Sequence, residues 1–344
     1  MKAMVLTGIR AMELRDVPDP KLESDTDVLL RLAVVGVCGS DVHYYATGRI
    51  GSQVVEYPFT VGHECSAVVE RVGSAVTRVK PGDRVAVEPA MPCGQCDQCR
   101  VGRPHTCRKL RFLGCPGQAR GCLSERLVMP EHSCFPIPGR MTLEQAALSE
   151  PLSIGLYAAR FSVSMPGAAI GILGAGPIGL SVLVSARHMG ARAIYVTDRM
   201  DRRLEVARVA GAGWGGNPDR QDVVREIASR EPLLLDAVFE CCGQQAALDQ
   251  AVELLKPGGK LMLVGIPEID RVSFEIDKLR RKEICIQNVR RQNHCVQDAL
   301  DLISSGGLGV DFMVTHRFPL ARCREAFEMV HAYSDGVVKA MIQC

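Results

Sequence analysis

The chain lacks the features that mark several large classes of protein. It has one Trp and nine Phe among 344 residues, and its 41 basic side chains are balanced by 39 acidic ones, which argues against a surface for nucleic acid or anionic membranes. No apolar run approaches the roughly 20 residues that a membrane-spanning helix needs. The N-terminal segment also lacks the apolar core of a secretory signal. We therefore expect a cytoplasmic protein that binds neither nucleic acid nor membrane.

Cysteine, in contrast, is abundant, with 15 in the chain. Thiols in the cytoplasm stay reduced, so an odd number spread over a long chain favours free thiols and metal ligands over a disulfide framework. The spacing of these cysteines is therefore informative about metal binding.

The patterning of the chain predicts two domains, as does its length of 344 residues. Residues 28–37 and 65–87 form short β-branched segments separated by Gly, Pro and Asp, a pattern typical of all-β structure. After Pro166, apolar strands alternate with helical stretches, which predicts a parallel α/β sheet. The segment from residue 291 onward carries a helix and strand-like ends that we expect to rejoin the first domain.

Four cysteines lie close together in a polar loop. Cys93, Cys96, Cys99 and Cys107 follow the spacing C-x2-C-x2-C-x7-C. Short gaps turn successive thiolates toward one ion, and four thiolates complete the tetrahedral coordination of a structural Zn²⁺. An iron-sulfur cluster is one alternative. A zinc ribbon that binds nucleic acid is another, and the balanced charge of the chain argues against it.

A glycine-rich turn predicts dinucleotide binding. Gly174, Gly176 and Gly179 form G-x-G-x-x-G directly after an apolar strand and at the start of a helix, the context in which this pattern holds a pyrophosphate. Asp198 follows the next strand, 19 residues beyond Gly179, where a carboxylate accepts the ribose hydroxyls and repels a 2′-phosphate. NAD is therefore favoured, while the adjacent Arg199 keeps NADP open.

A second set of metal ligands is suggested by two short motifs, GVCGSD and VGHE, which contain Cys38, His63 and Glu64. One thiolate, one imidazole and one carboxylate can hold a catalytic zinc with a fourth position for water or substrate. The sequence by itself does not bring the three together. Taken singly, each has an ordinary explanation as a buried thiol, a core histidine and a solvated charge.

Several motifs in the same order resemble one family. They are GVCGSDVHYYATGRIG, PFTVGHE, VKPGDRVAVEP, the four-cysteine loop, SEPLSIGLYAAR, GILGAGPIGL, PGGKLMLVG and VTHRFPL. Together they resemble the zinc-dependent medium-chain dehydrogenases, in the sorbitol (polyol) dehydrogenase branch, over essentially the whole chain. The resemblance implies an α/β protein with a chaperonin-10-like β-rich catalytic domain at 1–154 and 290–344. It also implies a doubly wound Rossmann domain at 155–289 and a homotetramer, with a dimer as the alternative.

The resemblance further implies roles for individual residues. Cys38, His63 and Glu64 become ligands of a catalytic zinc, with Glu150 as a further ligand or as the partner of a water molecule. Ser40 lies on the proton route, and His43 is a weaker candidate for the same route. The substrate positions are Tyr44, Glu150 and Arg291. The positions around NAD, besides the three glycines, are Ile178, Asp198, Arg203, Val264, Gly265, Ile266, Val289, Arg290 and Arg291.

Two departures from the polyol branch bear on the substrate. Arg290 and Arg291 stand in a turn that commonly reads Phe-Arg-Tyr in that branch, and the loop PGQARG at 116–121 replaces an acidic PPDDG. This gain of basic residues suggests a hydroxy acid derived from a sugar, whose carboxylate pairs with Arg290, Arg291 or Arg120. The equal alternative is that these arginines are solvated or contact cofactor phosphates.

The sequence thus predicts a zinc-dependent oxidoreductase with NAD and two zinc ions per chain, one catalytic and one structural. Zinc would act as a Lewis acid on a secondary hydroxyl of a polyol or sugar-derived substrate, and hydride would pass to the nicotinamide. Oxidation of an aldonate, of threonine or of a short diol is the alternative. A zinc-free quinone reductase or a non-catalytic binding protein of the same fold is a rival that Cys38, His63 and Glu64 argue against.

Overall fold

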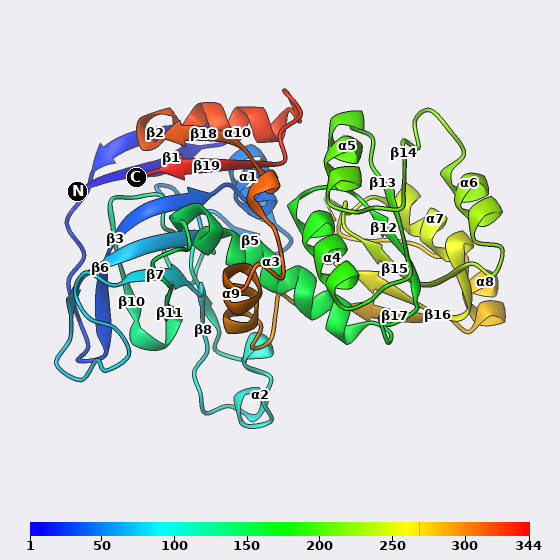
Figure 1. Cartoon of the computed structure of the whole chain (residues 1–344). Coiled ribbons are helices and arrows are strands. Elements are labelled where there is room, and N and C mark those ends of the chain that lie inside the picture. Colours follow the sequence, from blue (N-terminus) through cyan, green and yellow to red (C-terminus); the bar gives the residue numbers. More distant parts are fainter. Residues whose placement is uncertain (268) are drawn as a thin grey trace. The chain divides into compact units, whose positions relative to one another are not determined.

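The computed structural model describes residues 1–267 and 269–344, and the chain forms two compact units (Figure 1). The first comprises Met1–Glu150, Val296–Gly306 and Val314–Cys344, and the second comprises Pro151–Cys295 and Gly307–Met313. These divisions differ from the expected ones after residues 154 and 289. Helix α3 (Leu143–Phe161) runs through the first division without a break, so no turn residue marks it in the sequence.

The first unit is built on a seven-stranded sheet in the order β11-β7-β6-β3-β19-β18, in which β10 also pairs with β3. Only β18 and β19 pair in parallel within this described sheet. Since β19 pairs with β3, the end of the chain joins its beginning (Figure 1). The strands are β3 (Asp27–Gly36), β6 (Glu64–Val72), β7 (Arg84–Val87), β10 (Arg126–Pro130), β11 (Cys134–Pro136), β18 (Val314–Pro319) and β19 (Lys339–Gln343).

Smaller elements complete this unit. The two-stranded pairs are β1 (Lys2–Gly8) with β2 (Ala11–Asp16), β4 (Arg49–Ile50) with β5 (Gln53–Val54), and β8 (Ala90–Met91) with β9 (Arg111–Phe112). Besides the start of α3, the α-helices of this unit are α1 (Gly39–Thr47), α2 (Asp97–Arg100), α9 (Val296–Ser304) and α10 (Cys323–His331). Val28, Leu30 and Leu32 alternate along β3 and lie in the main apolar cluster, as the β-branched pattern of the sequence predicts.

The second unit contains a six-stranded, entirely parallel sheet in the order β14-β13-β12-β15-β16-β17. All five residues of β12 are buried, as expected for a parallel strand covered on both faces. The predicted parallel α/β sheet is confirmed. Its strands are β12 (Ala169–Leu173), β13 (Ala193–Thr197), β14 (Trp214–Gly216), β15 (Leu235–Glu240), β16 (Leu255–Leu263) and β17 (Cys285–Asn288), and its helices are α4 (Pro177–His188), α5 (Asp201–Val209), α6 (Val223–Arg230), α7 (Gln245–Leu254) and α8 (Ile276–Lys282).

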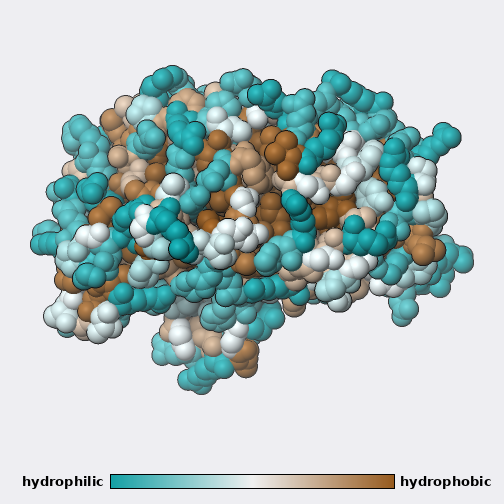
Figure 2. All heavy atoms as spheres, viewed as in Figure 1, coloured by the Kyte–Doolittle hydropathy of each residue, from teal (hydrophilic) through white to brown (hydrophobic). Residues whose placement is uncertain are grey.

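The surface is of mixed polarity. On the face shown in Figure 2, hydrophilic side chains surround smaller apolar areas, in keeping with a nearly balanced charge. Across residues 1–267 and 269–344, no helix combines the length and apolar character that crossing a bilayer requires.

Candidate functional site

The four clustered cysteines converge on one point of the first unit. One sulfur atom from each of Cys93, Cys96, Cys99 and Cys107 lies within 4.8 Å of the others, and Cys96 Sγ is 3.6 Å from Cys99 Sγ. Backbone N–H groups of Cys99 and Arg108 lower the pKa of the Cys96 thiol to about 6, which favours the thiolate that a metal binds. Four converging sulfurs fit a closed tetrahedral Zn²⁺.

An ion pair closes the same loop. Arg108 donates from Nε and Nη2 to the two carboxylate oxygens of Asp97, at 2.5 and 2.9 Å. This bidentate geometry joins the turn that carries Cys96 and Cys99 to the residue after Cys107. The loop is therefore tied together by side chains as well as by any shared ion.

A second convergence brings together Cys38, His63 and Glu64, whose ligand atoms all lie within 4.8 Å of one another. Cys38 precedes α1, Glu64 begins β6, and His63 directly precedes that strand. His63 and Glu64 are buried, at 6% and 1% exposure, and Cys38 is half-buried. A thiolate, an imidazole and a carboxylate fit zinc with an open position.

Asp41, which sequence reasoning missed, orients His63. Its Oδ1 lies 3.2 Å from His63 Nδ1 and accepts the backbone N–H of Gly62 at 3.0 Å. A carboxylate at Nδ1 fixes the tautomer that leaves Nε2 with a lone pair for a metal. Burial lowers the pKa of His63, but the charges of Asp41 and Cys38 outweigh it and raise that pKa well above its ordinary value. The available signal was the position of Asp41 in the same GSD motif as Ser40.

Lys339 was also missed, and it is the direct partner of Glu64. Its Nζ lies 2.8 and 2.6 Å from the two carboxylate oxygens of Glu64 and 3.1 Å from the Val37 carbonyl oxygen. Lys339 is 1% exposed. Burial lowers its pKa, but Glu64 and Cys38 raise it above the ordinary value, and Glu150 adds to that rise. Glu150 is itself buried, and its electrostatic effect on Lys339 associates it with this cluster.

The remaining predicted residues of the first unit lie on and around α1. Ser40 donates from Oγ to Cys38 Sγ at 3.3 Å. The Tyr44 hydroxyl donates to Gln53 Oε1 at 3.0 Å, and the Gln53 amide contacts Cys115 Sγ at 2.8 Å. His43 is half-buried, and Arg120 is exposed in the loop at 116–121.

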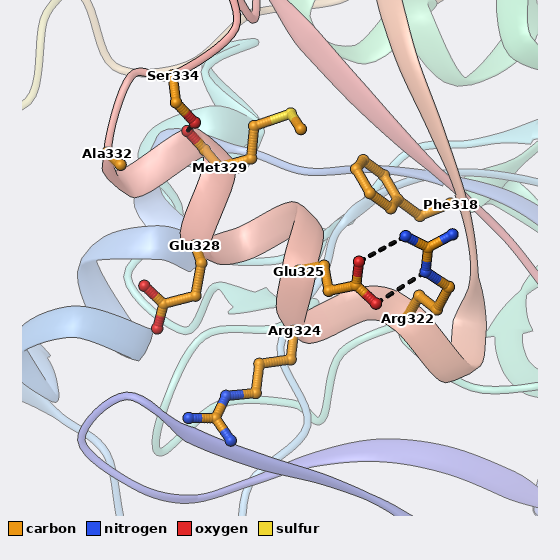
Figure 3. Close-up of a pocket in the computed structure, with 8 residues that line it drawn as sticks. All are labelled: Phe318, Arg322, Arg324, Glu325, Glu328, Met329, Ala332 and Ser334. Atoms are coloured by element: carbon orange, nitrogen blue, oxygen red, sulfur yellow. Dashed lines mark hydrogen bonds and ion pairs between the residues drawn. The ribbon is translucent and has the colours of Figure 1, made fainter.

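Helix α1 is fixed by its contact with α10. The Tyr45 hydroxyl donates to Glu328 Oε1 at 2.6 Å, and the Tyr45 ring packs edge-on against Phe327 with 5.4 Å between ring centroids. Glu328 also lines a groove of about 560 Å³ beside α10 (Figure 3). Figure 3 shows the Arg322–Glu325 ion pair in its wall. None of the predicted site residues lines this groove, so it is separate from both cysteine-containing clusters.

In the second unit, the glycine turn has the close approaches that its pattern requires. Gly174 has φ 106°, and a Cβ on Gly179 would lie 1.8 Å from the Gly174 carbonyl oxygen. Asp198 reaches this turn: its Oδ2 accepts the Ala175 N–H at 2.7 Å and its Oδ1 accepts the Met200 N–H at 2.8 Å. The carboxylate expected to contact ribose is thus held at the edge of the glycine loop.

The other predicted cofactor residues lie on helices α4 and α5 and in two turns of the same unit. Arg203 is 8% exposed, and its Nη1 would lie 3.6 Å from a Cβ on Gly176, while Ile178 is the second residue of α4. Val264, Gly265 and Ile266 follow β16, and a Cβ on Gly265 would lie 2.5 Å from the Gly243 nitrogen. Val289, Arg290 and Arg291 follow β17; Arg290 is exposed, and Arg291 is buried with φ 54°.

Two family models match the chain. Residues 24–139 match the alcohol dehydrogenase GroES-like domain, and residues 177–305 match the zinc-binding dehydrogenase model. The first match contains the four clustered cysteines and Cys38, His63 and Glu64, but neither Glu150 nor Lys339. The second contains Asp198 and most of the predicted cofactor residues.

Named relatives match along nearly the full length. A sorbitol dehydrogenase from Bacillus subtilis is 36% identical over 343 residues, which cover 99% of this chain and 97% of that protein. An L-idonate 5-dehydrogenase from Vitis vinifera is 34% identical over 343 residues, which cover 98% of this chain and 93% of that protein. Among solved structures, a zinc-binding dehydrogenase from Sinorhizobium meliloti bound to NADP aligns with a TM-score of 0.92 and 29% identity, over 100% of this chain and 99% of that one.

Proposed function

We propose a specific reaction for this chain, which belongs to the zinc-binding dehydrogenase family and is therefore an oxidoreductase. It oxidises a secondary hydroxyl of a polyol or sugar-derived substrate to a ketone and transfers hydride to NAD. The observation that carries this proposal is the convergence of half-buried Cys38 with buried His63 and Glu64.

Each residue of this cluster has a separate role in the proposed reaction. Cys38, His63 and Glu64 would hold a zinc ion, which supplies Lewis-acid polarisation of a hydroxyl oxygen when bound. Asp41 keeps the His63 ring in one orientation. The Ser40 hydroxyl lies 3.3 Å from Cys38 Sγ, and it would exchange a hydrogen bond with the substrate hydroxyl and pass the substrate's proton toward solvent. Glu150 is the buried carboxylate that would assist this proton transfer, or act as a further ligand.

The four-cysteine cluster would hold a second zinc ion with a structural role. Its four sulfurs leave no position for substrate, so its contribution is to the stability of the loop between β8 and β9. We therefore propose two zinc ions per chain.

The cofactor we propose is NAD. Asp198 at the edge of the glycine loop supports it, because a carboxylate there accepts ribose hydroxyls and repels a 2′-phosphate. NADP is the alternative, since the Sinorhizobium meliloti relative is bound to it. Replacing Asp198 with Ala should weaken binding of NAD far more than binding of NADP, measured by calorimetric titration. Equal weakening would remove Asp198 from ribose recognition.

Two substrate classes have support. The sorbitol dehydrogenase relative favours a polyol. The L-idonate 5-dehydrogenase relative favours a sugar acid, whose carboxylate Arg290, Arg291 or Arg120 would pair with. Threonine and short diols are weaker candidates that use the same chemistry.

A screen of polyols and aldonates with NAD, monitored by the absorbance of the reduced nicotinamide, tests the proposal. Activity on xylitol or sorbitol supports the polyol class, and activity confined to aldonates supports the acid class. Glu150→Ala should reduce turnover sharply while NAD affinity stays near normal. Activity on neither class in a zinc-loaded protein would contradict the proposed substrate.

We also propose that the protein acts in the cytoplasm as a homotetramer, with a small-molecule hydroxyl substrate and no nucleic-acid or membrane partner. The resemblance to the polyol dehydrogenases supports the tetramer, and a dimer is the alternative. Light scattering coupled to size-exclusion chromatography distinguishes the two.

A further inference from the structure

The guanidinium of Arg199 is a donor suited to a 2′-phosphate, because it directly follows Asp198. In this structure it already has an anionic partner. Arg199 Nε donates to Asp219 Oδ2 at 2.7 Å, and the side chains are 76% and 51% exposed. A carboxylate from the segment after β14 therefore engages the donor that an NADP phosphate would need.

The backbone of both members of this ion pair is held in place by one buried side chain, that of Asn217. Asn217 is 6% exposed. Its Nδ2 donates to the Arg199 carbonyl oxygen at 2.8 Å, and its Oδ1 accepts the Asp219 N–H at 3.0 Å. One amide thus fixes the backbone on both sides of the ion pair, so Asp219 is placed against Arg199 by the fold.

A second carboxylate, that of Asp201, pairs with a second arginine next to this ion pair. Asn217 Nδ2 also donates to Asp201 Oδ1 at 2.9 Å, and Asp201 pairs with Arg220 at 2.6 Å. The second arginine of this segment is therefore also engaged by a carboxylate. A 2′-phosphate, with a charge between about −1.5 and −2, would approach Asp198 and Asp219 with Arg199 and Arg220 already paired.

We propose that Asp219 is a specificity-determining residue for the cofactor, whose carboxylate engages Arg199 and so excludes a 2′-phosphate from the adenosine pocket. The inference rests on the cofactor site of the proposed function and is independent of the zinc chemistry. Asp198 accepts hydrogen bonds from the ribose hydroxyls, and Asp219 pairs with the Arg199 guanidinium that would otherwise neutralise the 2′-phosphate.

The test is Asp219→Asn in the full chain, which removes the charge and keeps the backbone N–H that bonds to Asn217. Calorimetric titration would measure NAD, NADP, 5′-AMP and adenosine 2′,5′-bisphosphate. We expect affinity for the two 2′-phosphorylated probes to rise about threefold to tenfold, while NAD and 5′-AMP change by less than about twofold. The gain should shrink as ionic strength rises, because both groups are exposed.

Two further variants separate the mechanism from a general charge effect. Asp277→Asn removes the same charge on α8, where Asp277 pairs with Arg280 and Arg281, and should leave the probe ratios unchanged. In an Arg199→Gln background, Asp219→Asn should lose most of its effect. A full gain in that background, an equal gain from Asp277→Asn, or no gain from Asp219→Asn would each overturn the inference.

Failure of this inference is distinguishable from failure of the proposed cofactor. A wild-type protein that binds NADP more tightly than NAD contradicts the NAD proposal, whatever the variants do. The shift in the NADP to NAD ratio caused by Asp219→Asn tests Asp219 alone. Asp219→Ser, with the melting temperature of each variant as a check on folding, repeats the measurement with a smaller neutral side chain.

Discussion

Lys339 is 1% exposed, and an ammonium group so far removed from water needs a matched negative charge. Glu64 supplies that charge through both carboxylate oxygens. The pairing also concerns the candidate zinc site, because Glu64 is one of its three converging residues. Lys339 therefore holds a candidate ligand in place and contributes a positive charge beside it.

Lys339→Met should lower the free energy of unfolding of the metal-free protein by about 3–5 kcal/mol, because Glu64 would stay buried without its partner. The free energy of unfolding of the metal-loaded protein should fall by less, since a bound cation would offset the negative charge of Glu64. Denaturant titration of both forms measures the difference.

Arg317→Met is the matched control for that variant. Arg317 pairs with Glu144, but the arginine side chain is 49% exposed, so the loss should stay below about 1 kcal/mol. Equal losses from the two variants would show that the buried pair has no special role in stability.

Among the elements, α3 and α4 approach each other closely at Gly155. A Cβ on Gly155 would lie 2.4 Å from the carbonyl carbon of Ser181, which no real side chain tolerates without movement. Helix propensity alone favours Ala over Gly by about 1 kcal/mol. The steric clash of the added Cβ with Ser181 destabilises the protein by more than the helix propensity of Ala stabilises it, so the net effect is a loss of stability.

Gly155→Ala should therefore destabilise the protein by about 1–3 kcal/mol, despite the better intrinsic propensity of Ala. Thermal and denaturant unfolding measure the change. Gly82→Ala tests conformational strain without crowding, because Gly82 has φ 90° and no heavy atom within 4 Å of its added Cβ. A stabilised Gly155→Ala protein would contradict the close approach of the two helices.

The contact between α1 and α10 makes stability depend on pH. Hydrogen bonds from Arg10 and Tyr45 lower the pKa of Glu328 from its ordinary 4.5. A carboxylate whose pKa is lowered by folding contributes stability that is present above pH 4.5 and is lost as pH falls through the lower, folded-state value.

Tyr45→Phe removes one of these hydrogen bonds and should cost about 1 kcal/mol at neutral pH. The difference from the wild type should narrow as the pH falls through the lowered, folded-state pKa of Glu328, because a protonated Glu328 no longer offers Tyr45 a charged acceptor. Unfolding curves at neutral and acidic pH provide the comparison. A difference that stays constant with pH would separate Tyr45 from the ionisation of Glu328.

For the whole molecule, the two cysteine-containing clusters predict different consequences of metal loss. Cys96→Ser should remove one metal ion per chain and lower the melting temperature, since a closed site contributes folding energy. Cys38→Ser should remove the other ion and abolish turnover with a smaller thermal effect. Elemental analysis and calorimetry measure both quantities.

Cys285→Ser is the control for these two variants, because Cys285 is exposed on β17 and belongs to neither cluster. It should leave the metal content unchanged. An unchanged metal count and melting temperature in Cys96→Ser would remove the structural role from the four-cysteine cluster.

The sequence by itself determined the features that depend on short stretches of chain. The spacing from Cys93 to Cys107 and the turn from Gly174 to Gly179 each lie within one short stretch of chain, so neighbouring residues fix their geometry. The strand and helix alternation after Pro166 likewise indicated the parallel sheet, because each βα unit carries its own periodicity.

Only the tertiary structure decided which distant residues meet. Lys339 contacts Glu64 because β19 and β6 lie on either side of β3. Asp219 contacts Arg199 directly, and Asn217 positions the backbone of both residues. Asp41 and Lys339 looked like ordinary charged residues because their partners are 22 or more positions away in sequence. Pairing between strands and the burial of charge act across such separations, and no local pattern of residues records them.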